Sequence, residues 1–287
     1  MAEMADDISR SFAKKLVDLG AVHVNGRRVR KCSLPLNLRD EIEVNIDGLS
    51  LTPYVLTEAD IVFQDKFILL INKPAGVDSQ PTPSRYKGTL YAAVADYLRN
   101  PLRKDLRPTI GMVQRLDRDT SGLIIFSIHP AAHKELSHLF SQRAVVKKYR
   151  AIVAGRITET SGEFASQLAR RRSTNMMVSV EKGGKDAITR FQLLAASDIA
   201  SYVEVEIPTG RSHQIRAHFS EAGHPLLGDV KYGGIEQIDE QKFTRQMLHA
   251  SSLSLNHPRH GDKLDFHLDL PYDMKTVVTQ LFPGVIN

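Results

Sequence analysis

The chain has 287 residues and a formal net charge of +5, with 38 Lys and Arg against 33 Asp and Glu. A surplus of positive charge favours a polyanionic partner such as nucleic acid. The sequence contains no apolar run of membrane length and no signal-peptide pattern at its N-terminus, so we expect a cytoplasmic protein without a membrane partner. The single cysteine, Cys32, excludes an intramolecular disulfide and fits a reducing compartment.

The first elements of the chain are small and basic. Ser9 can cap a helix over residues 10–19, and Gly20 can end it. The turn pair Asn25-Gly26 predicts a β-hairpin from residue 22 to residue 31. A solvated basic surface and a surface that binds a phosphate backbone both fit this charge pattern. The residues expected to contact the backbone are Arg10, Lys14, Arg27, Arg28, Arg30 and Lys31.

Polar, turn-rich residues follow this module, and the length of the chain allows a second domain. We place the basic module at residues 1–48, a linker at 49–60 and a larger domain at 61–287. Strand patterns in the larger domain do not alternate regularly with helix patterns as βαβ units do. The sequence therefore predicts an α+β fold with a mixed, largely antiparallel sheet flanked by helices. The clearest patterns are strands at 61–63, 67–71, 145–153, 187–194 and 202–207, and helices after Thr89 and at 131–142.

One stretch of the larger domain, residues 112–126, begins and ends as a β-strand, so its centre must turn. Asp117 is expected at the end of the first strand, with Arg115 two residues before it on the same strand face. Arg115 and Arg118 surround the carboxylate with positive charge. The pattern fits an Asx-type turn with solvated arginines, and it also fits a reactive carboxylate.

A second stretch, residues 209–223, predicts a short helix with Ser212 as its cap and Ile215 on its inner face. Arg216 falls in the first turn, near the buried stripe. A buried guanidinium needs an anionic partner, and Asp117 is the candidate.

Three histidines, His213, His218 and His224, lie in or beside this helix. Their spacing matches neither a zinc helix nor a ligand knuckle, so we expect no metal site.

Several motifs resemble those of the RluA-like RNA pseudouridine synthases. Residues 114–123 resemble the catalytic motif, in which the aspartate corresponding to Asp117 is essential. Residues 148–151 resemble the second motif, whose tyrosine packs against the target base and corresponds to Tyr149. Residues 214–216 resemble the third motif, whose arginine pairs with the catalytic aspartate and corresponds to Arg216. Residues 9–44 are similar to a shortened S-four-like RNA-binding module.

The resemblance implies an isomerase that converts specific uridines of structured RNA to pseudouridine, with ribosomal RNA favoured over transfer RNA. The uridine must first leave its stack, and Arg115 would insert into the gap, although a simple phosphate contact is the alternative role. Ile215 and Leu248 would line the pocket. An isomerisation implies no cofactor, and we expect a monomer. Two other classes stay open: an RNA-binding factor without activity, and a hydrolase using Asp117 with His218.

Overall fold

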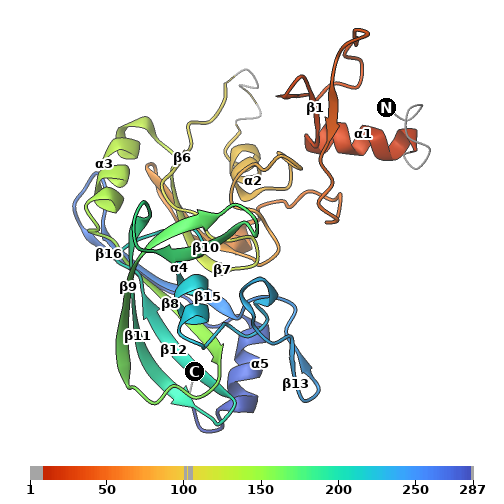
Figure 1. The fold of residues 1–287 in the computed structure, drawn as a ribbon. Coiled ribbons are helices and arrows are strands. Elements are labelled where there is room, and N and C mark those ends of the chain that lie inside the picture. Colours follow the sequence, from red (N-terminus) through yellow and green to blue (C-terminus); the bar gives the residue numbers. More distant parts are fainter. Residues whose placement is uncertain (1–8, 100–101, 103–105, 286–287) are drawn as a thin grey trace. The chain divides into compact units, whose positions relative to one another are not determined.

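The computed structural model describes residues 9–99, 102 and 106–285, and Figure 1 shows the path of the chain. The chain divides into two compact units. Unit 1 consists of Met1–Asp60 and Val77–Pro108, and unit 2 consists of Ile61–Gly76 and Thr109–Asn287. None of the helices in the described part of the chain has the length and apolar character needed to span a bilayer.

Unit 1 contains a helix and a three-stranded antiparallel sheet in the order β2-β1-β3. The Ser9 hydroxyl accepts a hydrogen bond from the Phe12 N–H, and Gly20 ends the helix with φ +85°. These local signals explain why the helix begins and ends where the sequence predicts. The elements of unit 1 are α1 (Arg10–Leu19), β1 (Val22–Val24), β2 (Arg27–Arg28), β3 (Ile42–Val44), the 3₁₀ helix η1 (Glu58–Asp60) and α2 (Leu90–Tyr97).

Residues 77–108 group with the N-terminal residues, although the sequence assigns them to the larger domain. Hydrogen bonds explain this grouping. The backbone N–H groups of Tyr86 and Lys87 both donate to the Leu19 carbonyl, and the buried Arg85 donates two bonds of 2.6 Å to the Asp47 carboxylate. Contacts between segments distant in the sequence are not visible in a local pattern, and the three-part domain division stays a prediction.

Unit 2 is built on an 11-stranded mixed sheet in the order β10-β9-β11-β12-β8-β15-β7-β5-β4, to which β16 and β6 add at β15 and β7. All its strand pairs are antiparallel except β7 with β15, so the predicted α+β fold with a largely antiparallel sheet is confirmed. The strands are β4 (Ile61–Gln64), β5 (Ile68–Lys73), β6 (Gly111–Met112), β7 (Ser121–Ser127), β8 (Val146–Ala154), β9 (Ser161–Arg171), β10 (Met176–Val180), β11 (Lys185–Ala196), β12 (Ala200–Glu206), β15 (Leu248–Asn256) and β16 (Lys263–His267).

Helices cover the sheet of unit 2 at separate places. Leu136 of α3 (Pro130–Ser141) packs in one apolar cluster with β5, β7 and β15. Met274 of α5 (Tyr272–Leu281) packs with Ile152 of β8 in another cluster. A third helix, α4 (Gln214–Glu221), contributes Ala217 to a smaller cluster with β9 and β11. The remaining elements are η2 (Val230–Tyr232) and a small hairpin of β13 (Gln237–Ile238) and β14 (Gln241–Lys242).

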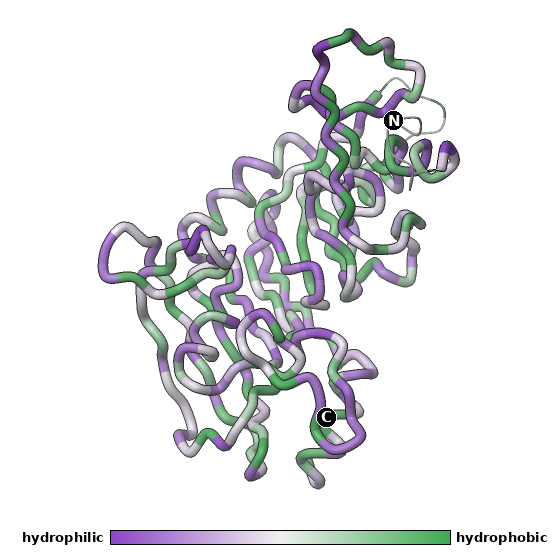
Figure 2. Tube along the Cα trace, turned by 45° about the vertical axis from the view of Figure 1, so that its right-hand side comes forward, coloured by the Kyte–Doolittle hydropathy of each residue, from purple (hydrophilic) through white to green (hydrophobic). Residues whose placement is uncertain are grey.

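The β9–β10 hairpin is absent from the predicted elements. The hairpin carries the basic run Arg170–Arg172, and its strands mix small, polar and apolar residues with little of the continuous apolar character of β7. Figure 2 shows such alternation of hydrophilic and hydrophobic residues along the chain. One face of the hairpin packs against α4. The residues that point to its other face therefore need not be apolar.

Gly122 allows the parallel pairing of β7 with β15. Its φ is +111°, and a Cβ atom there would lie 2.2 Å from the Ala250 carbonyl oxygen of the neighbouring strand. Only a residue without a side chain permits this approach of the two backbones.

Gly122→Ala is therefore expected to lower the free energy of unfolding by roughly 3 kcal/mol or to prevent folding, because it adds backbone strain and a clash. Gly223→Ala is the matched control, since Gly223 also has positive φ, +83°, but nothing lies within 4 Å of its added Cβ. Urea unfolding of both variants measures the difference. Equal losses in the two variants would exclude the close approach as the reason for glycine at position 122.

Candidate active site

Asp117 lies in the loop between β6 and β7, and the bend after it is closed by a hydrogen bond of 3.1 Å from the Thr120 N–H to the Asp117 carbonyl. The prediction that Arg115 and Asp117 share a strand face is wrong, because strand β6 ends at Met112. Arg115 instead extends, exposed, and its Nη2 donates to the Ser212 hydroxyl at 3.0 Å. A short polar loop therefore positions both side chains.

The structure brings Arg216 and Asp117 together, although 99 positions separate them in the chain. Nη1 of Arg216 donates to Oδ2 of Asp117 at 2.9 Å. The arginine side chain is 9% exposed and the carboxylate 24% exposed, so the pair lies where protein meets solvent. The carboxylate can be reached from outside, whereas its partner is enclosed.

A second carboxylate, which the sequence patterns did not single out, holds Arg216 from the other edge. Asp229 accepts from Nε at 2.6 Å and from Nη2 at 2.7 Å, and its side chain is 1% exposed. The guanidinium carbon also lies 4.8 Å from the ring centre of Tyr232. Burial alone would lower the pKa of Arg216, but Asp229 and then Asp117 raise it above its ordinary value.

His213 precedes α4 in a left-handed conformation, with φ 50° and ψ 22°, and its side chain does not cap the helix. The prediction that Ser212 caps α4 is wrong. The Gln214 side chain takes over part of this role, because its Oε1 accepts from the Arg211 N–H at 3.0 Å and from the Thr209 hydroxyl at 2.8 Å. The side chain of Gln214, within the helix, thus holds the preceding loop in place by hydrogen bonds.

The His213 ring lies between the Tyr232 hydroxyl and the Asp117 carboxylate. Its Nδ1 forms a hydrogen bond of 2.9 Å with the Tyr232 hydroxyl, and its Nε2 lies 3.9 Å from Oδ1 of Asp117. Burial lowers the pKa of His213, and the negative charge of Asp117 opposes that effect. At neutral pH the ring is therefore uncharged, and it can exchange a proton with a group beside Asp117.

Tyr149 is buried on β8, and the negative charge of Asp117 acts on it. Burial first and Asp117 second raise the pKa of Tyr149 above its ordinary value, so the phenol stays protonated. Ile215 and Leu248, the two predicted pocket residues, are both 4% exposed. Ile215 precedes Arg216 in α4, while Leu248 begins β15 opposite Ala151 of β8.

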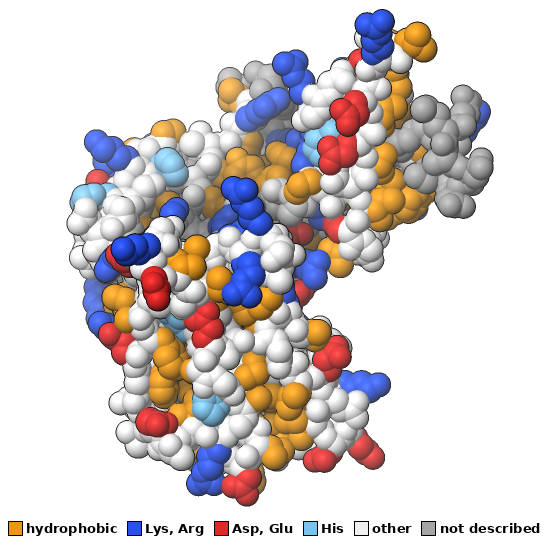
Figure 3. Space-filling view, viewed as in Figure 1, with side chains coloured by type: hydrophobic (Ala, Val, Ile, Leu, Met, Phe, Trp, Pro, Cys, Tyr) orange, Lys and Arg blue, Asp and Glu red, His pale blue; other side chains and the backbone are white. Residues whose placement is uncertain are grey.

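The predicted RNA-binding residues of unit 1 lie on its helix and hairpin. Arg28 is half-buried and donates to the Thr82 carbonyl, and Arg30 stacks 3.7 Å from the ring centre of Tyr86. The other predicted cations are exposed: Arg10, Lys14, Arg27 and Lys31. Figure 3 shows one face of the molecule, where Lys and Arg side chains lie among Asp and Glu. The RNA-binding role of these residues stays a prediction.

Helix α4, which carries Arg216, is anchored to the neighbouring strands by polar side chains. Glu221 accepts 2.7 Å and 2.5 Å bonds from the N–H and hydroxyl of Ser179. The His218 ring is hydrogen bonded to Ser166 at 3.0 Å and to Thr189 at 2.8 Å. Both nitrogens of His218 therefore serve to position the helix, which removes it as the partner of Asp117 in a hydrolase.

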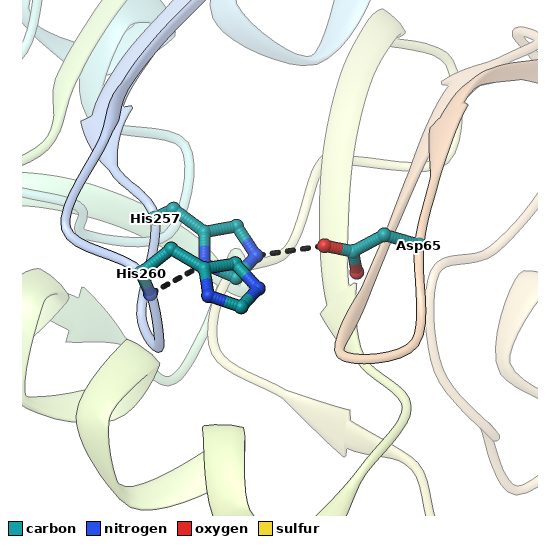
Figure 4. A group of neighbouring side chains, drawn as sticks. All are labelled: Asp65, His257 and His260. Atoms are coloured by element: carbon teal, nitrogen blue, oxygen red, sulfur yellow. Dashed lines mark hydrogen bonds and ion pairs between the residues drawn. The ribbon is translucent and has the colours of Figure 1, made fainter.

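A separate cluster joins the turn between β4 and β5 to the loop after β15. Asp65, His257 and His260 offer ligand atoms within 4.8 Å of one another (Figure 4). However, Nδ1 of His257 accepts from the N–H groups of Arg259 and His260 at 3.1 and 3.0 Å, so the ring proton resides on Nε2. That Nε2 donates to Asp65 at 2.8 Å. The donor set fits a structural hydrogen bond between two loops better than it fits a cation.

Comparisons with known proteins relate this chain to a known family. The family described as RNA pseudouridylate synthase matches residues 67–221, and the S4 domain matches residues 7–42. A protein of Bacillus subtilis named "Uncharacterized RNA pseudouridine synthase YlyB" is 33% identical over 98% of this chain and 92% of its own length. "Ribosomal large subunit pseudouridine synthase D" of Zymomonas mobilis is 32% identical, again over 98% of this chain and 92% of its own length.

A solved structure, "Human RNA Pseudouridylate Synthase Domain Containing 4", has a TM-score of 0.65 at 24% identity, over 80% of this chain and 95% of that one. This likeness supports the fold. The family match over more than half of the chain, together with the S4 match, defines an RNA-modifying enzyme. More specifically, the chain belongs to the RNA pseudouridylate synthase family, whose members are isomerases acting on RNA. The suspected family resemblance is confirmed.

Replacing Asp229 by Asn is expected to lower the free energy of unfolding by about 2–3 kcal/mol, because it removes the buried one of the two charges that compensate Arg216. Asp273→Asn is a matched control. Asp273 makes the same two-point contact with Arg245, at 2.6 and 3.0 Å, but its side chain is 43% exposed. Chemical unfolding at neutral pH compares the two variants. A smaller loss for Asp229→Asn than for Asp273→Asn would contradict the role given to the buried pair.

His249 predicts a pH dependence of stability. It is 1% exposed, and burial together with Arg245 lowers its pKa to about 4, whereas an unfolded histidine titrates near 6.5. As the pH falls from about 6.5 to 4, the unfolded chain takes up a proton that the folded chain does not, so stability falls.

His249→Asn should reduce the slope of unfolding free energy against pH in this window by up to about 1.4 kcal/mol per pH unit. His267→Asn, at a side chain that is 70% exposed, is the control and should leave the slope close to that of the parent. Denaturant titrations at a series of pH values give the slopes. A parental slope in the His249 variant would show that other groups cause the acid sensitivity.

Proposed function

We propose that this enzyme isomerises specific uridines of ribosomal RNA, or of transfer RNA as the alternative, with Asp117 as the essential residue. The observation that carries the proposal is the bond of 2.9 Å between Arg216 and Asp117 at the edge of the solvent. The name of the Zymomonas mobilis relative, a ribosomal large subunit pseudouridine synthase, favours the ribosomal substrate.

The reaction breaks the bond between the anomeric carbon and N1 of uracil and forms a bond from the same carbon to C5. The C5 proton leaves, and N1 regains a proton, so the product is an isomer and no redox partner is consumed. Arg216 binds Oδ2 of Asp117, and in the described part of the chain no hydrogen bond occupies Oδ1. This arrangement leaves one carboxylate oxygen able to act as a nucleophile or as a base.

Tyr149 and His213 suit two further needs of this chemistry. The phenol of Tyr149 is buried and stays protonated beside Asp117, so its ring can stack on an extruded base. The neutral His213 lies 3.9 Å from the carboxylate and can accept or return a proton. Neither group requires a cofactor, and we assign none.

Arg115 is positioned to act when the uridine leaves its stack. The guanidinium is exposed, and the one hydrogen bond that it makes among the described residues is to the hydroxyl of Ser212, so it can leave this partner at little cost. Inserted into the RNA, a planar guanidinium would fill the gap and offset part of the unstacking cost of a few kcal/mol. The alternative role, a phosphate contact, stays open for this residue.

The basic N-terminal module supplies the rest of the RNA contact. We assign residues 1–48 to RNA binding, residues 49–60 to a linker and residues 61–287 to catalysis, and we propose that the enzyme acts as a monomer on cytoplasmic RNA. The S4 domain match at residues 7–42 and the exposed cations of α1 and β2 support this assignment. A module that binds the RNA backbone without reading bases leaves the choice of uridine to the catalytic unit.

The test is tritium release from [5-³H]uridine in RNA transcribed from ribosomal and transfer RNA genes. Asp117→Asn and Asp117→Ala should each lose at least about 1,000-fold in rate, because the reacting carboxylate is gone. Asp119→Asn is the control, since Asp119 lies two residues away and pairs with the exposed Arg118. Release by the Asp117 variants at the parental rate would refute the role of Asp117, and release from transfer RNA alone would refute the preferred substrate.

A further inference from the structure

Strand β8 directs its basic side chains to opposite faces of the sheet. Lys147 and Tyr149 share one face, while Lys148 and Arg150 share the other. On that other face both cations pair with Glu204, at 2.7 Å and 2.8 Å. Lys147, on the face of Tyr149, has no carboxylate partner among the described residues. Two adjacent lysines on one strand therefore have different electrostatic environments.

The Lys147 ammonium is half-buried against a backbone segment. Its Nζ lies 3.7 Å from where a Cβ atom would stand on Gly210, and 5.8 Å from the ring centre of Phe140. A half-buried ammonium without an anion is costly, and proteins normally pair such groups. This position is therefore prepared for a negative charge that the chain itself does not provide.

Arg211 is a second cation, and it directly follows Gly210 in the chain. Its Nε donates to the Asp186 carbonyl at 2.8 Å, which leaves the other guanidinium nitrogens without a carboxylate among the described residues. Burial and the charge of Arg211 together lower the pKa of Lys147 to about 8, as expected when two cations lie close together without an anion. An anion bound between them would relieve this repulsion.

The segment that carries Arg211 leads to the reacting carboxylate. Residues 210–213 follow β12, and within this segment Ser212 binds Arg115 and His213 lies 3.9 Å from Asp117. The distance from Gly210 to His213 is three residues, or roughly 10 Å at most in an extended chain. A short chain segment therefore links the neighbourhood of Lys147 to that of Asp117.

We propose that Lys147 and Arg211 form a binding site for a backbone phosphate of the RNA strand beside the target uridine. Lysine supplies a point charge and arginine a planar fork, a combination suited to phosphate oxygens. The site rests on the proposed function, and it holds the strand without reading a base. Its task is to hold the backbone while the uridine turns toward Asp117.

The test compares Lys147→Gln and Arg211→Gln with the matched control Lys148→Gln, using [5-³H]uridine-labelled ribosomal RNA transcripts as the probe. Each of the first two variants should weaken RNA binding about tenfold and raise KM more than it lowers kcat. Each should also reduce the slope of log Kd against log salt by about 0.7, the value for one phosphate contact to a single strand. Lys148→Gln should match the parent, and Lys147→Arg should restore the slope.

Parental affinity and salt slope in both test variants would overturn the phosphate site. A change in Lys147→Gln that Lys147→Arg does not reverse would point to packing instead and would also overturn it. The unaltered enzyme separates this result from failure of the proposed function. If it binds the transcripts without releasing tritium, the substrate assignment fails while the salt slopes still decide the phosphate site, and if it binds none of them, both proposals fail.

Discussion

The site depends on how one guanidinium is divided between two acids. Asp229 takes Nε and Nη2 of Arg216, and only Nη1 is left to meet Asp117. Because a guanidinium is planar, fixing one edge also fixes the direction of the remaining N–H. The position of Oδ2 of Asp117 therefore follows from the contact of Arg216 with the buried Asp229. Two acids against one arginine leave net negative charge in the site.

One parallel strand pair in an otherwise antiparallel sheet supports the loop that carries Asp117. Its strand pairs are antiparallel except where β7 meets β15, and Gly122 permits that close approach. The loop that carries Asp117 leads directly into β7, and His249 of β15 binds Ser121 at 2.9 Å just beyond it. A parallel pair in the centre of the sheet is buried on both faces, which makes it a rigid support for a short polar loop.

Local chemistry accounts for what the sequence predicts well. Ser9 and Gly20 bound α1 as expected, and Arg216 has the anionic partner that its position requires. Nothing local distinguishes Asp229 from any other acid in a loop, because its role appears only when the chain folds back on α4. Likewise the left-handed turn at His213, and the grouping of residues 77–108 with the N-terminal unit, arise from tertiary contacts rather than from residue preference.

The polar anchoring of α4 has a mechanical consequence. Apolar contacts between a helix and a sheet can slide by fractions of an ångström, but the hydrogen bonds that Ser179 donates to Glu221 and the bond between His218 and Ser166 tolerate little displacement. The β9–β10 hairpin and α4 thus form one stiff body, and the hairpin carries the basic run Arg170–Arg172 near its tip. A displacement of the hairpin would therefore also move Arg216, and with it the carboxylate of Asp117 that Arg216 binds.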